Sequence, residues 1–157
     1  MEITLCTKVD YDQIITDMDD FWNSSHIDNL RRQHNPIYFY EFGNTAFVVK
    51  EGEEVIGYLF GLCSQTSPTA YVKFVGVRAS HRKRGVGRAL YEYFTMIAKE
   101  QGYNELKAIT SPNNKISIAF HQSLGMELLG EPNENGIPVM KDYAGPGNDR
   151  MVFRKYI

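Results

Sequence analysis

Apolar and polar positions alternate along this chain with two different periods. Residues 71–77 form a short run rich in β-branched and aromatic side chains, apolar on both faces except at Lys73, which is typical of a central strand. Residues 86–101 show the three- and four-residue spacing of an amphipathic helix. The apolar stripe of this helix consists of Val86, Leu90, Phe94 and Ile97. A buried strand, a short turn and a helix are therefore expected at the centre of the chain.

The same patterns predict the remaining elements. Thr7 and Asp10 have the spacing of a capping box that opens a helix reaching about Asp20, and a short helix is expected over residues 27–34. Another helix follows Asn114. Its predicted core face consists of Ile116, Ala119, Phe120, Ser123 and Leu124. Strands are expected at residues 2–6, 45–50, 55–63, 105–110, 126–129 and 151–156.

Two connections between these elements carry information. The strand at residues 105–110 follows a strand and a helix, so this crossover predicts that it runs parallel to residues 71–77. Residues 130–150 are rich in proline and glycine and are expected to lack regular structure, which is typical of a binding loop. We expect this segment to cover a substrate, with Asp142 and Tyr143 as contacts, or to form a homodimer interface.

Composition indicates one soluble globular domain spanning residues 1–157. Hydrophobic residues make up 43% and charged residues 23%, which excludes a disordered chain and a membrane protein. The first residues lack the basic and apolar pattern of a secretion signal, so a cytoplasmic protein is expected. Cys6 and Cys63 match neither a disulfide framework nor a zinc spacing, so no metal is expected.

The turn between the central strand and its helix is basic and contains two glycines. Arg82, Lys83 and Arg84 precede Gly85 and Gly87 at the start of the predicted helix. Glycines let backbone N–H groups approach a ligand, and the helix dipole together with nearby guanidinium groups favours negative charge. An anion, most simply a phosphate group, is the expected ligand. A surface turn with a solvated basic run is the alternative.

Residues 77–90 resemble the central motif of the GCN5-related N-acetyltransferases, in which Arg/Gln-x-x-Gly-x-Gly/Ala follows a strand ending in valine. Arg82, Gly85 and Gly87 occupy the three defined positions. The resemblance implies a loop that wraps the pyrophosphate of acetyl-coenzyme A and a strand end that pairs with its pantetheine arm. The residues implied are Val75, Gly76 and Val77 for pantetheine, and Arg82, Lys83, Arg84, Gly85, Val86, Gly87 and Arg88 for pyrophosphate.

The resemblance also implies the fold class. It is an α/β fold with a mixed, mostly antiparallel central sheet and helices on both faces. Two parallel strands splay apart in that sheet, and the thioester of acetyl-coenzyme A lies between them. Backbone groups of the central strand are then available to the pantetheine amides.

Residues 114–126 resemble a second motif of the same family. Asn114 is implied to bind the pantetheine arm, and a helix cap is an alternative role that does not exclude the first. His121 stands where many members have a tyrosine that protonates the departing thiolate, and some members have histidine. Imidazolium with a pKa near 6.5 could protonate a thiolate whose thiol has a pKa near 8.5, so His121 is the candidate acid. A histidine at the helix edge without a catalytic role is the alternative.

Candidate acceptor contacts lie in the irregular segments. The resemblance places the acceptor pocket beside the segment after the first helix, where Trp22, Tyr38 and Tyr40 are the expected contacts, with Tyr143 added from the later loop. Core packing is the alternative role for the aromatic cluster. The acidic residues at 17–20 are expected to be solvated, with binding of a cationic amine as the alternative.

The reaction implied by the resemblance is direct transfer of an acetyl group from acetyl-coenzyme A to a primary amine, carried by a small molecule or a peptide. The sequence assigns no general base. One alternative is a module that binds coenzyme A or another nucleotide without catalysis. Nucleic-acid binding through residues 81–84 is disfavoured because the net charge is -2 and the basic residues form one short cluster. No nucleic acid and no membrane partner are expected.

Overall fold

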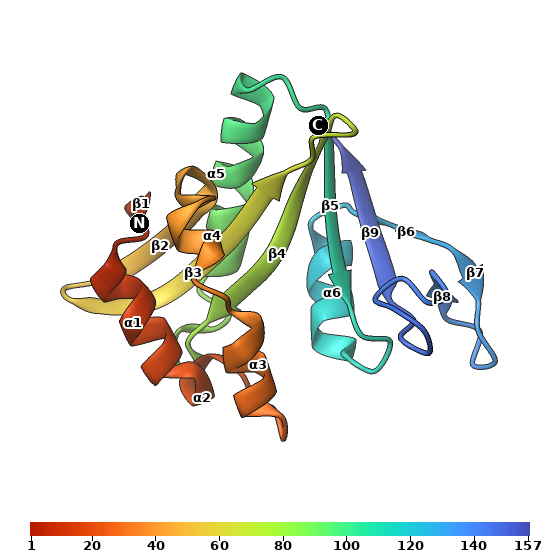
Figure 1. Ribbon diagram of the computed structural model, residues 1–157, viewed down its shortest axis with the longest axis horizontal. Helices are drawn as coiled ribbons and strands as arrows, with labels where there is room; N and C mark the ends of the chain where they lie inside the picture. Colours follow the sequence, from red (N-terminus) through yellow and green to blue (C-terminus); the bar gives the residue numbers. More distant parts are fainter. The chain divides into compact units, whose positions relative to one another are not determined.

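The computed structural model describes residues 1–157 and is mixed α/β (Figure 1). The strands are β1 (Ile3–Leu5), β2 (Ala46–Glu51), β3 (Glu54–Cys63), β4 (Thr69–Val77), β5 (Glu105–Thr110), β6 (Glu127–Leu129), β7 (Glu131–Pro132), β8 (Pro138–Val139) and β9 (Met151–Tyr156). The helices are α1 (Lys8–Thr16), α2 (Met18–Phe21), α3 (Ile27–Gln33), α4 (Ile37–Tyr40), α5 (Val86–Glu100) and α6 (Lys115–Ser123), with the short 3-10 helices η1 (Gly43–Thr45) and η2 (Ala79–His81).

The strands follow the order β1-β2-β3-β4-β5-β9-β6 in a seven-stranded sheet, and β7 and β8 form a small second sheet. β4 and β5 are parallel, paired from Thr69 with Glu105 to Val72 with Ala108. β1 with β2, β2 with β3, β5 with β9 and β6 with β9 are antiparallel. The predicted fold class, a mostly antiparallel mixed sheet with a parallel strand pair, is confirmed.

Two compact units make up the chain. The first consists of Met1–Leu62 and Lys73–Ile97, and the second of Cys63–Val72 and Ala98–Ile157. The division passes through β4 and through the last turn of α5, so the end of β4 and the loop that follows it belong to the first unit. The assignment of residues 1–157 to one domain stays a prediction.

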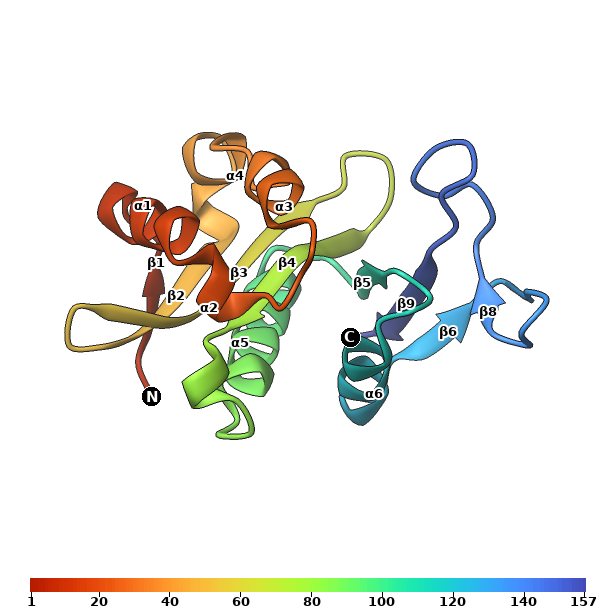
Figure 2. The same ribbon diagram turned by 90° about the horizontal axis from the view of Figure 1, so that it is seen from below.

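In the first unit, helices cover both faces of the strands, with α1 to α4 on one face and α5 on the other (Figure 2). Two glycines of β3 make room for α5. A Cβ at Gly57 would lie 2.5 Å from Val86, and one at Gly61 would lie 2.7 Å from the Phe94 ring. Both α5 residues belong to the predicted apolar stripe, and both are buried. The stripe is therefore confirmed as the face that packs on the sheet.

The face under α1 to α4 holds an aromatic core. Tyr58 and Phe60 are fully buried, and Phe74 is 8% exposed. Burial of each such side chain contributes roughly 1.5–3 kcal/mol to folding. A Cβ at Gly76 would lie 2.5 Å from the Tyr58 ring. Gly76 is thus required by the packing of Tyr58 inside the protein.

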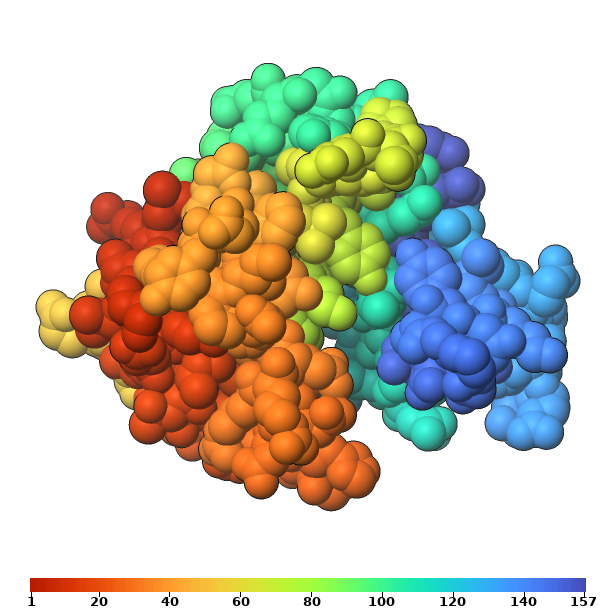
Figure 3. Space-filling view, viewed as in Figure 1, coloured from red at the N-terminus to blue at the C-terminus, as the bar shows by residue number.

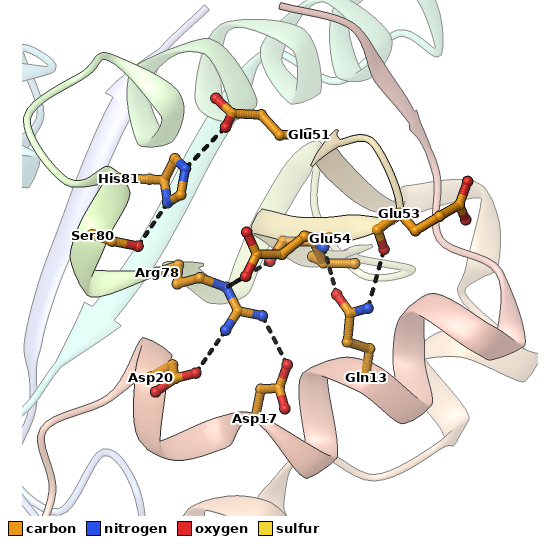
Figure 4. Close-up of polar contacts among 10 residues, drawn as sticks. Gln13, Asp17, Asp20, Glu51, Glu53, Glu54, Arg78, Ser80 and His81 are labelled. Atoms are coloured by element: carbon orange, nitrogen blue, oxygen red, sulfur yellow. Dashed lines mark hydrogen bonds and ion pairs between the residues drawn. The ribbon is translucent and has the colours of Figure 1, made fainter.

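The first helical segment begins as predicted and ends earlier. The Thr7 hydroxyl accepts from the Asp10 N–H at 3.2 Å, and the Asp10 carboxylate accepts from the Thr7 N–H at 2.9 Å, so the capping box is confirmed. α1 stops at Thr16, and a turn at Asp17 leads into the short α2. A continuous helix to about Asp20 was therefore wrong. The turn directs the acidic residues that follow toward the end of β4 (Figure 4).

In the second unit, α6 packs on β9, but with a different face from the predicted one. Ile116 is 79% exposed, whereas His121 is 3% exposed and stacks on Phe153 with 4.5 Å between ring centroids. Of the predicted face, Leu124 is buried, whereas Ile116, Ala119 and Ser123 are exposed, so the prediction holds only at the end of the helix. The helix instead directs His121 inward against Phe153. The two residues are far apart in sequence, so the local pattern could not predict this contact.

The connection at residues 130–150 is more regular than predicted. β7 and β8 form a small antiparallel hairpin, and Met140 bridges Arg150. Residues 141–149 close on themselves, because the Asp142 carboxylate accepts from the Gly147 N–H at 2.8 Å and the Asp149 carboxylate accepts from the Asp142 N–H at 2.9 Å. No helix of the protein combines the length and the apolar character needed to span a bilayer.

Candidate functional site

The loop between β4 and α5 has the backbone geometry of an anion site. Lys83 and Gly85 both adopt left-handed conformations, with φ of 63° and 82°. Such residues turn backbone N–H groups toward one concave side, and α5, 15 residues long, begins directly afterwards at Val86. N–H groups in the first turn of a helix have no partner within that helix and lie at the positive end of its dipole. These features favour the predicted anion site, and anion binding by the loop stays a prediction.

The side chains of the loop divide into anchoring and exposed groups. The Arg82 guanidinium donates to the Phe21 carbonyl at 2.7 Å and to the Val77 carbonyl at 3.3 Å, so it holds the loop to α2 and to the end of β4. Lys83 and Arg84 are exposed, and Arg84 Nη1 lies 3.9 Å from Glu51 Oε1. Arg82 thus fixes the loop, whereas Lys83 and Arg84 present positive charge at its surface.

His81 is directed inward, unlike the basic residues that follow it (Figure 4). Its Nδ1 lies 2.8 Å from Ser80 Oγ and its Nε2 lies 3.1 Å from Glu51 Oε2. The ring is 9% exposed. Residues 81–84 therefore do not form one solvated basic face, which weakens the nucleic-acid alternative further.

Arg78, which the sequence analysis did not identify, anchors the start of the same loop (Figure 4). Its guanidinium donates to Asp20 at 2.6 Å, to Asp17 at 2.8 Å and to the Val55 carbonyl at 3.0 Å. It also lies over the Phe21 ring, 4.9 Å from the centroid. The side chain is 7% exposed, so this is a largely desolvated cation held by several acceptors.

Asp19 and Asp20 are exposed, with side chains 68% and 61% accessible, as expected for a solvated acidic segment, but all three acidic residues at 17–20 also form ion pairs. Asp17 and Asp20 pair with Arg78, and Asp19 pairs with Arg31 at 2.6 Å. The sequence offered one indication, an arginine placed directly after the central strand. Its partners lie 58 and 61 residues away, a separation that no local pattern bridges.

The residues expected to contact pantetheine end the strand that leads into this loop. Val75 and Val77 are half-buried and alternate with the buried Phe74 and Gly76. The absence of a Cβ at Gly76 already has a reason in the Tyr58 ring. Contacts of Val75, Gly76 and Val77 with a pantetheine arm stay a prediction.

The aromatic cluster near the first helices is organised by a chain of hydrogen bonds. The Trp22 indole N–H donates to the Tyr58 hydroxyl at 2.7 Å, and this hydroxyl lies 2.8 Å from Nε2 of His34. Nδ1 of His34 lies 2.8 Å from the Leu30 carbonyl and must carry the proton, so Tyr58 donates to Nε2. Burial lowers the pKa of His34 to about 4. The ring is therefore neutral near pH 7, and the chain fixes the orientation of Trp22.

Trp22 and Tyr38, two of the expected acceptor contacts, are half-buried in the first unit. Tyr38 packs edge-on against Phe74 with 5.8 Å between centroids, so it reaches the central strand. Tyr40 is 62% exposed and packs against Phe39. The segment from α3 to α4 lies at the surface of the first unit (Figure 3, orange). Trp22 and Tyr38 thus combine core packing with a partly accessible ring, and acceptor contacts stay a prediction.

The remaining site residues belong to the second unit. Asn114 caps α6, since its side-chain oxygen accepts from the Ser117 N–H at 3.0 Å, and the cap role is confirmed. Its contact with pantetheine stays a prediction. Tyr143 is 43% exposed in the 141–149 loop, and its acceptor contact likewise stays a prediction.

His121 is held in a way that bears on its expected role. Its Nδ1 lies 2.7 Å from the Ser117 carbonyl, so in the neutral ring Nδ1 carries the proton and Nε2 does not. Burial lowers the pKa of His121 below its usual value. A neutral ring of this tautomer has no proton to give at Nε2. Both features count against His121 as the acid at neutral pH, and the assignment stays a prediction.

Comparison with known proteins adds to this geometry. The sequence model of the acetyltransferase (GNAT) family matches residues 11–126, a range that includes most of α1, the β4–α5 loop and α6. The human N-acetyltransferase 8 is 28% identical over 99 residues, which cover 60% of this chain and 43% of that protein. The chain thus spans less than half the length of this curated relative.

Two solved structures share the fold over nearly the whole chain. The ribosomal-protein-S18-alanine N-acetyltransferase from Escherichia coli has a TM-score of 0.69 at 14% identity, covering 99% of this chain and 93% of that one. An aminoglycoside 6'-N-acetyltransferase complexed with coenzyme A has a TM-score of 0.66 at 16% identity, covering 99% and 97%. With the family match extending over most of its residues, the chain belongs to the acetyltransferase (GNAT) family.

Proposed function

We propose that this protein is an N-acetyltransferase that transfers the acetyl group of acetyl-coenzyme A to a primary amine. The observation that carries the proposal is the β4–α5 loop. Arg82, Gly85 and Gly87 stand at the defined positions of the family motif, and the backbone turns left-handed at Lys83 and Gly85 immediately before α5. Sequence pattern and backbone geometry therefore favour the same ligand group, a phosphate.

The backbone conformation and the charge of this loop support the pyrophosphate of the donor substrate as its ligand. Backbone N–H groups of residues 83–88 would hold the phosphate oxygens, with Lys83 and Arg84 supplying exposed positive charge. A solved relative of the same fold is complexed with coenzyme A, which supports this donor. In the transfer, the amine nitrogen forms a bond to the thioester carbon and the carbon–sulfur bond breaks, leaving a thiolate that takes up a proton.

The acceptor is proposed as a small molecule or a peptide carrying a primary amine. The relatives with this fold include proteins named for an aminoglycoside and for a ribosomal-protein alanine, so the scaffold serves both kinds of acceptor. Trp22 and Tyr38 are the proposed contacts in the first unit, because both rings are half-buried, Tyr38 against Phe74 of β4 and Trp22 against Tyr58 of β3. A cytoplasmic location and a homodimer stay predictions.

A second candidate function is binding of coenzyme A without transfer. The burial of His121 favours it, because the family position of the proton donor is occupied by a ring that is neutral near pH 7. Transfer can still proceed if solvent protonates the thiolate. A thiol with a pKa near 8.5 is mostly protonated at pH 7, so water can supply this proton. Turnover therefore does not require His121.

Release of free thiol from acetyl-coenzyme A tests the proposal. The purified protein is incubated with acetyl-coenzyme A and a panel of primary amines that includes an aminoglycoside, an amino acid and a peptide with a free N-terminus. Thiol release that depends on one class of amine is the expected result. Binding of the donor with no thiol release for any amine would support the binding module instead.

A further inference from the structure

We infer that Arg78 and two of its three carboxylate partners, Asp17 and Asp20, position the coenzyme loop; the third, Glu54, lies 3.4 Å from Nε of Arg78. Asp17 and Asp20, at the α1–α2 corner, hold the Arg78 guanidinium, and through it they hold the loop in the conformation that binds phosphate. The inference rests on the proposed function, because the loop that these residues position is the proposed site for the donor. Asp17 and Asp20 themselves touch neither donor nor acceptor. Asp17 and Asp20 are therefore positioning residues.

Arg78 lies where β4 ends and the β4–α5 loop begins. It directly follows Val77, the last residue of β4, and directly precedes η2, which leads into the loop. Its backbone N–H donates to the Ile56 carbonyl at 2.9 Å, so the main chain here is still tied to β3. Beyond this bond, the backbone bonds from His81 to Arg78 and from Arg82 to Ala79 are local to η2, and side chains tie the segment to the α1–α2 corner. The guanidinium turns inward to the α1–α2 corner, as Figure 4 shows.

A second arginine attaches the loop to the same corner. Arg82 donates to the carbonyl of Phe21, the residue that follows Asp20, and the Phe21 ring lies under the Arg78 guanidinium. The two arginines lie four residues apart and enclose η2. Both thus fasten the segment that precedes Lys83, where the backbone becomes left-handed at a residue with a side chain. That conformation is unfavourable for lysine by itself, so it needs support from surrounding structure.

Removal of Asp17 and Asp20 should change anion binding in opposite directions, depending on whether they act through their charge or through the loop geometry. Asp17 and Asp20 are negative charges near a loop that binds an anion, so their removal should strengthen anion binding through the Coulomb term alone. If they instead maintain the loop geometry, their removal should weaken binding. The sign of the change separates the two effects.

The test compares Asp17→Asn/Asp20→Asn with Asp19→Asn in the full chain, using coenzyme A as the calorimetric probe. Asp19 lies between the same two residues but pairs with Arg31, so its variant changes the charge without touching Arg78. We expect the double variant to bind coenzyme A about tenfold more weakly, and Asp19→Asn to bind within twofold of wild type. Reversible unfolding would also raise the apparent dissociation constant, so thermal unfolding of both variants is measured beside the titrations, which are run at a temperature where both variants are fully folded.

Kinetics with acetyl-coenzyme A give the second readout. The double variant should show a KM for acetyl-coenzyme A raised about tenfold with kcat within twofold, since the reacting groups are untouched. Binding by the double variant that is tighter than wild type, or within twofold of Asp19→Asn, would overturn the inference while leaving the proposed function in place. Failure of the wild-type protein to bind coenzyme A would overturn both.

Discussion

Two irregular loops of the protein each contain a non-glycine residue in the left-handed conformation. One loop is held by contacts with distant residues, and the other by contacts within itself. The β4–α5 loop contains Lys83 at φ 63°, and the 141–149 loop contains Asp142 at φ 55°. The first is tied through Arg78 and Arg82 to α1 and α2, about 60 residues away in sequence. The second is closed by its own carboxylates and backbone.

This difference shows what each loop requires. Asp142 stabilises its own turn, because its carboxylate accepts from the Gly147 N–H, and short polar side chains tolerate this conformation well. Lys83 has no such local compensation in its own side chain, whose polar group lies at the end of a long aliphatic stem. We conclude that the β4–α5 loop keeps its shape through distant contacts, which is expected where geometry serves binding.

The largest expected effect concerns His34, which is buried in the first unit and stacks on Phe74 of β4 with 3.8 Å between ring centroids. Its pKa is about 4 in the folded protein and near 6.5 when unfolded, so the unfolded state takes up the proton first as the pH falls. The stability linked to a neutral His34 is therefore intact above about pH 6.5 and is lost between about pH 6.5 and 4. The loss should reach about 3 kcal/mol.

Denaturant unfolding at a series of pH values measures this effect. The control is His26, which lies on the surface of the same unit. His26→Gln should keep the wild-type pH dependence, whereas His34→Gln should have a shallower one over this range. Equal slopes for wild type and His34→Gln would show that His34 is not the source.

The next effect concerns Gly76, in the strand that leads into the β4–α5 loop. Gly76→Ala would place a Cβ 2.5 Å from the Tyr58 ring and should lower the free energy of unfolding by about 2–3 kcal/mol. Gly43→Ala is the matched control, because nothing lies within 4 Å of its added Cβ, and it should stay within about 0.5 kcal/mol of wild type. If both variants had the same stability, the close packing of Tyr58 on β4 would be incorrect.

The smallest expected effect is a difference in stability between glycine variants of Lys83 and Asp142, the two residues in the left-handed conformation. Lys83→Gly removes the strain of that conformation and should raise stability by about 1 kcal/mol. Asp142→Gly removes less strain, because aspartate tolerates this conformation better, and also loses the bond to Gly147, worth about 1 kcal/mol, so it should not raise stability. Thermal unfolding of both variants checks this order. A larger gain for Asp142→Gly would contradict the difference in support.

Much of the fold follows from local pattern, and the exceptions have a common cause. The capping box at Thr7, the stripe of α5 and the parallel course of β5 depend on neighbouring residues or on connection length, so the sequence predicts them. The inward turn of His121 and the pairing of Arg78 depend on partners that only folding brings near. Those contacts were missed for that reason.

For the candidate site, the sequence identifies the residues of the loop but not the contacts that their side chains make. The motif identifies Arg82, but in the structure its guanidinium donates to backbone carbonyls and its backbone N–H donates to the Ala79 carbonyl at 3.5 Å, so its contact with phosphate stays a prediction. Aromatic residues such as Trp22 were expected near an acceptor, but the bond to Tyr58 that orients the indole could not be anticipated. Composition and spacing specify neither bond.

Calorimetric titration with acetyl-coenzyme A tests the central claim, that the β4–α5 loop binds the donor, most directly. Wild type should bind in the micromolar range, and desulfo-coenzyme A, which cannot carry an acetyl group, should bind similarly because the loop contacts the phosphates. Lys83→Glu/Arg84→Glu reverses two exposed charges and should weaken binding about 100-fold or more without unfolding the protein. Equal affinity of the variant and wild type would contradict the assignment of the loop.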